Sequence, residues 1–137
     1  MKREKILIFI PAYNVEKKIK KVLKKIPKII FKKYDIKILI IEDFLNNKKL
    51  KIIKNILKTK KNKNRINLIT NKSNKGYGGV QKIAFNYSIN KKYKYIVMLH
   101  GDNQYPANKL LNLIKPLVTN KFDAVFGSRM INSLDAI

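Results

Sequence analysis

The sequence predicts an α/β fold in which a mostly parallel sheet is covered by helices on both faces. Three observations support this prediction. Short, continuous apolar runs, typical of strands buried on both faces, alternate along the chain with segments whose apolar residues recur at helical spacing. This repeated order of strand and helix favours right-handed crossovers between parallel strands. The chain has 137 residues, of which 45% are hydrophobic, and this suits one domain over residues 1–137 with a sizeable core.

The first predicted strand and helix lie close to the N-terminus. Residues 6–10 form an apolar run that Pro11 closes, as expected for a short buried strand. Apolar residues at helical spacing follow over residues 15–26. Asn14 fits the N-cap of this helix, and Pro27 is expected to stop it because proline cannot continue a helix.

The middle of the chain repeats the same order twice. Residues 36–41 are a second apolar run, and residues 50–57 carry the pattern of a second amphipathic helix. Residues 66–69 predict a third short strand. Residues 71–79 contain three glycines and predict a loop, after which residues 80–87 predict a third helix.

The last part of the chain predicts two further strands on either side of a fourth helix. Residues 95–99 form a strand that leads into the loop 100–106, and residues 110–117 carry the helical pattern. A fifth strand is predicted at residues 124–126. In parallel sheets ligands bind beyond the carboxyl ends of the strands, so the loops after the first four strands form the candidate site.

Composition narrows the classes of function. Lysine and arginine number 32 against 8 aspartates and glutamates, a formal net charge of +24. Lysine, isoleucine and asparagine supply about half of the chain, so we interpret most of this charge as compositional bias, with a selected polyanion site as the alternative. The absence of cysteine excludes disulfides, thiolate metal clusters and cysteine nucleophiles. No apolar run approaches the ~20 residues that span a bilayer, which predicts a soluble or peripheral protein, and a cytoplasmic location is compatible.

Four of the eight acidic residues fall at or just past the carboxyl ends of predicted strands: Glu16, Glu42, Asp43 and Asp102. Grouped carboxylates repel one another unless a cation or hydrogen-bond donors offset their charge. A divalent metal, or a ligand rich in hydroxyl and N–H groups, is therefore the expected complement. The alternatives are structural: a helix N-terminus for Glu16, a helix cap for Glu42 and Asp43, and a turn for Asp102.

Five short motifs occur in a fixed order along the chain. They are Pro11-Ala-Tyr-Asn-Val-Glu16, Ile40-Ile-Glu-Asp43, Asn74-Lys-Gly-Tyr-Gly-Gly79, Leu99-His-Gly-Asp-Asn-Gln104 and Gly127-Ser-Arg129. The ordered set resembles the family 2 glycosyltransferases, and is closest to the branch with dolichol- and polyprenyl-phosphate sugar transferases. The resemblance implies a nucleotide-diphospho-sugar transferase fold of the GT-A, Rossmann-like type, a divalent cation and an inverting displacement at the anomeric carbon of the sugar.

The resemblance also implies roles for the residues that match the motifs in the first three loops. Those expected to line the nucleoside pocket are Pro11, Ala12, Tyr13 and Glu16. Glu42 and Asp43 correspond to paired acids that recognise base and ribose, a task that suits carboxylates because they accept hydrogen bonds from N–H and hydroxyl groups. In the glycine loop, Gly76 and Gly79 permit close backbone approach to the nucleotide and Lys75 can meet phosphate, with a tight turn as the alternative.

The loop after the fourth strand resembles the metal motif of the family, and we expect Mg²⁺ or Mn²⁺ there. Alternate residues of an extended segment point the same way, so His100, Asp102 and Gln104 are expected to converge on one cation. His100 replaces the usual acid and favours Mn²⁺, with a hydrogen-bonding role as the alternative. Asp102 and Arg129 are the candidate catalytic residues. Arg129 is expected near the reacting phosphate, with a surface ion pair as the alternative.

The expected partners follow from the same resemblance. The donor is a GDP- or UDP-sugar, and a polyprenyl phosphate of cell-envelope glycan biosynthesis is the candidate acceptor, at the inner face of the membrane. The lysines of the helix over residues 15–26 predict a salt-sensitive attraction to anionic lipid. Family members continue beyond the last motif into the acceptor region, so we expect this chain to bind donor, to transfer sugar poorly and to self-associate as a homo-oligomer. The alternatives are a non-catalytic remnant that binds nucleotide sugar and a basic nucleic-acid-binding module, although no specific nucleic-acid motif is present.

Overall fold

A computed structural model describes residues 3–43, 47–58 and 64–128 of the chain. Its centre is a four-stranded parallel sheet with the order β3-β2-β1-β4. The strands are β1 (Lys5–Pro11), β2 (Asp35–Glu42), β3 (Ile66–Thr70) and β4 (Tyr95–Met98). The helices are α1 (Glu16–Lys25), α2 (Lys28–Lys33), α3 (Asn47–Leu57), α5 (Gly76–Asn90), the short 3₁₀ helix η1 (Ala107–Lys109) and α6 (Leu110–Val118).

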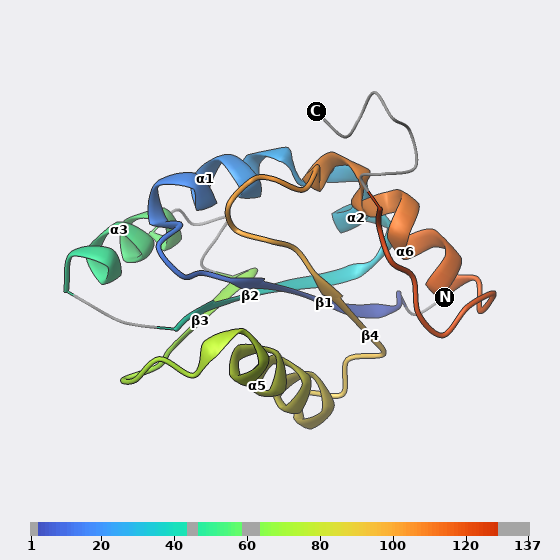
Figure 1. Cartoon of the computed structure of the whole chain (residues 1–137). Helices are drawn as coiled ribbons and strands as arrows, with labels where there is room; N and C mark the ends of the chain where they lie inside the picture. Colours follow the sequence, from blue (N-terminus) through green and yellow to red (C-terminus); the bar gives the residue numbers. More distant parts are fainter. Residues whose placement is uncertain (1–2, 44–46, 59–63, 129–137) are drawn as a thin grey trace.

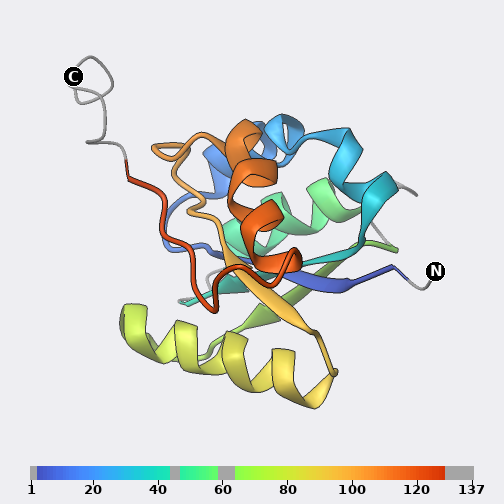
Figure 2. The same cartoon turned by 90° about the vertical axis from the view of Figure 1, so that its right-hand side faces the viewer.

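The sheet is sandwiched between two layers of helix. Among the helices of the described residues, α1, α2, α3 and α6 lie over one face of the sheet and α5 lies over the other (Figure 1). The view turned by 90° shows the same separation, with α5 below the sheet and α6 above it (Figure 2). The predicted α/β fold with helices on both faces is therefore confirmed.

Both faces of the two central strands are buried, which explains why their sequences are continuous apolar runs. In β1 the side chains of Ile6, Ile8 and Ile10 pack in the cluster beneath α1, α2 and α6, whereas Leu7 and Phe9 pack against α5. All five are at most 2% exposed. Burying such side chains stabilises the fold by roughly 1.5–3 kcal/mol each, so β1 and β2 hold the loops at their ends on a rigid support.

Two details of the first helices differ from the sequence prediction. Val15, not Asn14, is the N-cap of α1, because Asn14 adopts a left-handed backbone conformation with φ of 54° and makes the turn before the helix. Pro27 follows the C-cap residue of α1, as predicted, but it is also the N-cap of α2, a helix that the sequence analysis missed. A proline is compatible with the start of a helix because the first N–H groups have no intrahelical partner.

The predicted fifth strand is wrong. Residues 124–126 are irregular, and no strand of the described sheet pairs with them. Phe126 is 91% exposed, whereas a strand of the predicted kind would bury it. A run of three apolar residues does not show whether a neighbouring strand is available for pairing. Here residues 124–126 pair with none of the described strands.

No helix in the described parts of the chain is long and apolar enough to cross a membrane.

Candidate functional site

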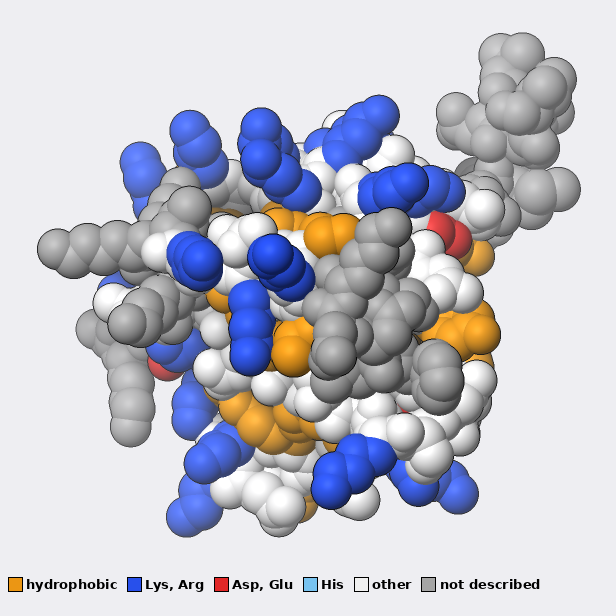
Figure 3. All heavy atoms as spheres, turned by 90° about the vertical axis from the view of Figure 1, so that its left-hand side faces the viewer, with side chains coloured by type: hydrophobic (Ala, Val, Ile, Leu, Met, Phe, Trp, Pro, Cys, Tyr) orange, Lys and Arg blue, Asp and Glu red, His pale blue; other side chains and the backbone are white. Residues whose placement is uncertain are grey.

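The described parts of the loops after β1, β2, β3 and β4 lie along one edge of the sheet because all four strands run in parallel. Figure 3 faces the side of the molecule on which β1, β2 and β3 end. Lysine and arginine side chains are spread over the described part of this surface, and acidic side chains are few. Such a surface favours an anionic ligand.

The loop after β1 is anchored at its start. Ala12 is buried, and its N–H donates to the carbonyl of Ile41 at 2.8 Å, which extends the pairing of β1 with β2 by one residue. Tyr13 is half exposed. The predicted nucleoside residues Pro11, Ala12 and Tyr13 therefore lie at the edge of the sheet, whereas the side chain of Glu16 is outside the described residues.

The loop after β4 packs directly on the loop after β1. Gly101 is buried, and a Cβ atom built there would lie 2.8 Å from Cγ2 of Val15 and 3.1 Å from the carbonyl oxygen of Pro11. No side chain fits in this space. The sequence analysis did not single out Gly101, although a glycine inside a candidate binding loop signals a close approach. This contact brings the predicted metal motif next to the predicted nucleoside loop.

We expect Gly101→Ala to lower the free energy of unfolding by about 1–3 kcal/mol, because the added methyl group must displace Val15 or the loop backbone. Urea denaturation measures this change. Gly127→Ala is the matched control, since its Cβ would lie 3.6 Å from Leu113, at ordinary contact distance. Equal effects of the two substitutions would contradict the proposed contact. Adding Val15→Ala should recover part of the loss at position 101.

Two acidic residues at the end of β2 are buried. Glu42 is fully buried and Asp43 is 3% exposed. Oδ1 of Asp43 accepts hydrogen bonds from Nδ2 of Asn71 at 2.8 Å and from the N–H of Lys75 at 2.9 Å. Asp43 therefore joins the end of β2 to the loop after β3 and to the start of α5. The sequence analysis missed Asn71, although it is the first residue after β3 and could have been found by the same argument as the acids.

The glycine-containing segment is helical over part of its predicted loop. Helix α5 begins at Gly76, so the prediction that residues 71–79 form a loop is wrong for its last four residues. Gly76 has φ of 70°, and its N–H donates to Oδ1 of Asn74 at 2.7 Å. A Cβ at Gly79 would lie 2.7 Å from Cβ of Lys75. The glycines therefore shape a compact helix start that leaves Lys75 exposed.

The segment that carries the predicted metal motif is a turn. Asn103 has φ of 65°, and the carboxylate Oδ1 of Asp102 accepts the N–H of Gln104 at 2.9 Å. The prediction that His100, Asp102 and Gln104 lie in an extended segment is therefore wrong, because residues 101–103 form a turn. Their convergence on one cation stays a prediction. Among the described residues, no three histidine, aspartate or glutamate side chains form a metal-binding group.

His100 is part of an aromatic stack. Its ring centroid lies 4.6 Å from that of Tyr105 and 5.9 Å from that of Tyr77, with interplanar angles of 28° and 18°. The Tyr77 hydroxyl donates to the sulfur of Met98 at 3.2 Å and lies 3.5 Å from Nε2 of His100. The stack joins the first turn of α5 to the end of β4. The sequence analysis did not use Tyr77 or Tyr105 in this way.

The structure thus brings the candidate residues together in two linked pairs of loops. Gly101 joins the loops after β1 and β4, and Asp43 joins the loops after β2 and β3. The stack of Tyr77 and His100 connects the two pairs. Arg129, the second candidate catalytic residue, lies outside the described residues.

Comparison with known proteins identifies relatives of this chain. The family described as glycosyl transferase family 2 matches residues 7–136. An uncharacterized protein of Methanocaldococcus jannaschii is 35% identical over 124 residues, which cover 90% of this chain and 52% of the relative. The chain therefore spans about half the length of this curated relative.

Solved structures share the fold. The mannosyltransferase PcManGT from Pyrobaculum calidifontis, in complex with GDP-Man and Mn²⁺, matches with a TM-score of 0.62 and 16% identity, covering 82% of this chain and 32% of that one. TarS 1–349 of S. aureus, in complex with UDP, matches with a TM-score of 0.55 and 18% identity, covering 85% and 33%. The architecture is that of the GT-A glycosyltransferases.

Proposed function

Because the chain belongs to glycosyl transferase family 2, we propose that it binds a nucleotide-diphospho-sugar at the carboxyl edge of its sheet and serves in the transfer of the sugar. The observation that carries this proposal is the joining of the four loops at that edge through Asp43, Gly101 and the stack of Tyr77 and His100. The alignment with the family runs through all four of these loops, so the residues that match its motifs are the natural ligand contacts.

In this proposal the nucleoside lies between the loops after β1 and β2. Tyr13 offers an exposed aromatic face at this edge, and Asp43 has acceptor capacity for N–H or hydroxyl groups beyond its two hydrogen bonds. Glu42 is fully buried, so no direct contact between its side chain and the nucleoside is proposed. The solved structures in complex with GDP-Man or UDP make guanosine and uridine the first nucleosides to test.

The diphosphate is proposed to lie near the start of α5. This helix has 15 residues, and its first N–H groups carry the positive end of the helix dipole. Lys75, the N-cap residue, is exposed and adds a full positive charge at the same place. Both features would stabilise a phosphate group placed there.

The residues present fit a divalent cation that is shared with the nucleotide. Asp102 uses one lone pair of its carboxylate in the turn and keeps further acceptor capacity for a hard cation. Mg²⁺ and similar ions are often held by one or two carboxylates together with phosphate oxygens. We therefore assign Asp102 as the residue that would hold Mg²⁺ or Mn²⁺, with Gln104 and His100 as neighbouring candidates. When bound, such an ion stabilises the negative charge that develops on the departing nucleotide.

The proposed reaction is an inverting displacement. An acceptor oxygen forms a bond to the anomeric carbon as the bond from that carbon to the diphosphate oxygen breaks, and the electron pair leaves with the nucleotide. A lipid phosphate such as polyprenyl phosphate is already anionic, so this acceptor needs no residue to remove a proton. The cytoplasmic face of a membrane is the setting that this acceptor implies.

A thermal-shift experiment tests the proposal. We expect GDP or UDP, with Mn²⁺, to raise the melting temperature, because a ligand that binds only the folded state stabilises it by about 2.7 kcal/mol at a hundredfold excess over Kd. EDTA should reduce the shift, and ADP should give a smaller one. If a single-stranded oligonucleotide stabilises the protein and no nucleoside diphosphate does, the chain is a nucleic-acid-binding module instead.

A further inference from the structure

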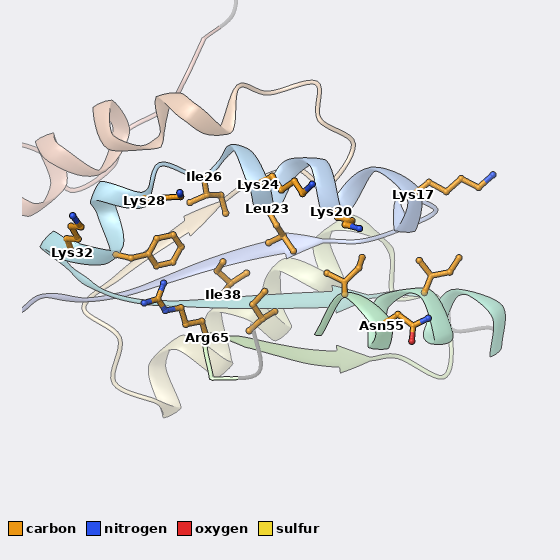
Figure 4. A pocket seen from close by; sticks show the side chains of 14 residues that line it. Lys17, Lys20, Leu23, Lys24, Ile26, Lys28, Lys32, Ile38, Asn55 and Arg65 are labelled. Carbon is orange, nitrogen blue, oxygen red and sulfur yellow. The ribbon is translucent and has the colours of Figure 1, made fainter. Parts of the chain in front are cut away.

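A cleft of about 810 Å³ lies between the helices over one face of the sheet. Its walls come from α1 and α2 on one side and from α3 on the other, and β2 and β3 contribute to its floor (Figure 4). We call it the α1–α3 cleft. It runs beside the length of α1, about 15 Å, and its floor is a face of the sheet, so it is separate from the row of loops proposed to bind the donor.

The floor of the α1–α3 cleft is apolar. Seven aliphatic or aromatic side chains line the floor and the inner walls of the cleft: Leu23, Ile26, Phe31, Ile38, Ile52, Ile56 and Ile66. Ile26, Ile38 and Ile66 are nearly buried, whereas the other four are only half-buried and leave apolar surface facing the cleft. A concave apolar surface of this kind favours an apolar ligand, because filling it removes that surface from water.

The rim of the cleft is positively charged. Its basic residues are Lys17, Lys20, Lys24, Lys28, Lys32 and Arg65, and none of the 14 lining residues is acidic. The lysines at positions 17, 20 and 24 follow one face of α1, because residues three and four apart are neighbours on a helix. Lysine side chains can cover an apolar floor with their methylene groups and keep their ammonium groups in water.

Arg65 closes one end of the cleft. Its guanidinium lies 4.9 Å from the ring centroid of Phe31, and Lys28 and Lys32 lie at the same end in Figure 4. Three cations therefore gather where the apolar floor ends. An anionic group placed there could pair with them while an attached hydrocarbon chain extends along the floor.

We propose that the α1–α3 cleft binds an anionic single-chain lipid, with its hydrocarbon chain on the floor and its head group at the basic rim. Charge and shape both favour this occupant. The cleft volume lies within the range of about 300–1,000 Å³ that is typical of small-molecule sites. A flat bilayer surface would meet the lysines of the rim but could not reach a recessed floor, whereas a separate chain can enter it.

Competition binding tests this proposal with oleate, used below the concentration at which it forms micelles, against the fluorescent fatty acid cis-parinarate. We expect saturable binding of oleate, at least tenfold weaker binding of uncharged oleamide, and no competition by acetate. The variant Lys20→Gln, Lys24→Gln, Lys28→Gln should lower the affinity for oleate at least tenfold. The variant Lys18→Gln, Lys21→Gln, Lys25→Gln is the matched control, because it removes the same charge from exposed lysines that do not line the cleft.

A second measurement locates the bound chain. In methyl NMR spectra, oleate should shift the signals of Ile52 and Ile56, which line the cleft, and leave unchanged that of Ile114, a buried residue of α6 that does not line the cleft. Leu23→Trp should narrow the cleft beside α1 and reduce both the shifts and the competition. Equal loss of affinity in the two lysine variants, or binding only to anionic vesicles, would overturn the proposal, as would displacement of cis-parinarate by an acidic amphipathic peptide but not by oleate.

Discussion

Replacing Asp102 with asparagine is expected to lower the affinity for a nucleoside diphosphate at least about tenfold when Mn²⁺ is present. The amide oxygen of asparagine can still accept the N–H of Gln104, which Oδ1 of Asp102 accepts at 2.9 Å, so the turn persists. Only the negative charge is lost. Loss of residues that merely support metal ligands typically costs about 10–100-fold in affinity, and loss of a direct ligand should cost no less.

Calorimetric titration with Mn²⁺ and with EDTA distinguishes this effect from a general loss of binding. In EDTA the variant and the unchanged protein should bind the nucleotide with equal affinity, because the substitution leaves the nucleoside contacts in place. Asp123→Asn is the control, since Asp123 is exposed in the segment after α6 and belongs to none of the four loops. Equal affinity of the Asp102 variant and the unchanged protein in Mn²⁺ would disprove the assignment.

The four observed strands were predictable because a strand that is buried on both faces consists of a continuous run of apolar residues. In β1, five consecutive apolar residues fill two different cores, so almost no polar residue is tolerated. Residues 124–126 show the limit of this argument. Three apolar residues satisfy the same pattern, but a strand also requires a free neighbouring edge, and this depends on the whole topology.

The boundaries of helices were harder to predict because competing local conformations decide them. Asn14 is a favourable N-cap by residue type, yet it takes a left-handed conformation, which asparagine also adopts more readily than most residues. Gly76 has a low helix propensity, yet it begins α5, where its N–H, which has no partner within the helix, donates to Oδ1 of Asn74. Asparagine is compatible with both an N-cap and a left-handed turn, and glycine with both a loop and a helix start. Contacts with the rest of the fold determine which conformation is adopted.

Sequence motifs identified the loops of the candidate site but not the contacts that join them. The acids at the end of β2 were expected to face ligand, whereas Asp43 also holds Asn71 and the start of α5. Gly101 owes its importance to Val15, more than 80 residues away in the sequence. Such contacts between loops depend on which strands are neighbours in the sheet, and a local sequence pattern does not show this.

Asp43 should have the largest effect on both stability and donor binding. We expect Asp43→Ala to lower the free energy of unfolding by about 3–6 kcal/mol, because a hydrogen bond to a charged group contributes about 1.5–3 kcal/mol and two such bonds are lost at a site only 3% exposed. Asp35→Ala is the matched control at the exposed, opposite end of β2, where about 0.5 kcal/mol or less is expected. Urea denaturation compares the two variants.

Asp43→Asn separates the structural role of this residue from its proposed role in binding. The asparagine oxygen can still accept from Asn71 and Lys75, so stability should fall less than in the alanine variant. Donor affinity should nevertheless fall, because the carboxylate charge that the base or ribose would contact is gone. For each kcal/mol of stability lost, the loss of donor affinity should be at least as large in Asp43→Asn as in Asp43→Ala. Unchanged nucleotide affinity in a stable Asp43→Asn protein would leave Asp43 as a purely structural link between β2 and α5. A double-mutant cycle with Asn71→Ala then measures that link directly, with a coupling energy of about 0.5–3 kcal/mol expected for two residues in one buried hydrogen-bond network.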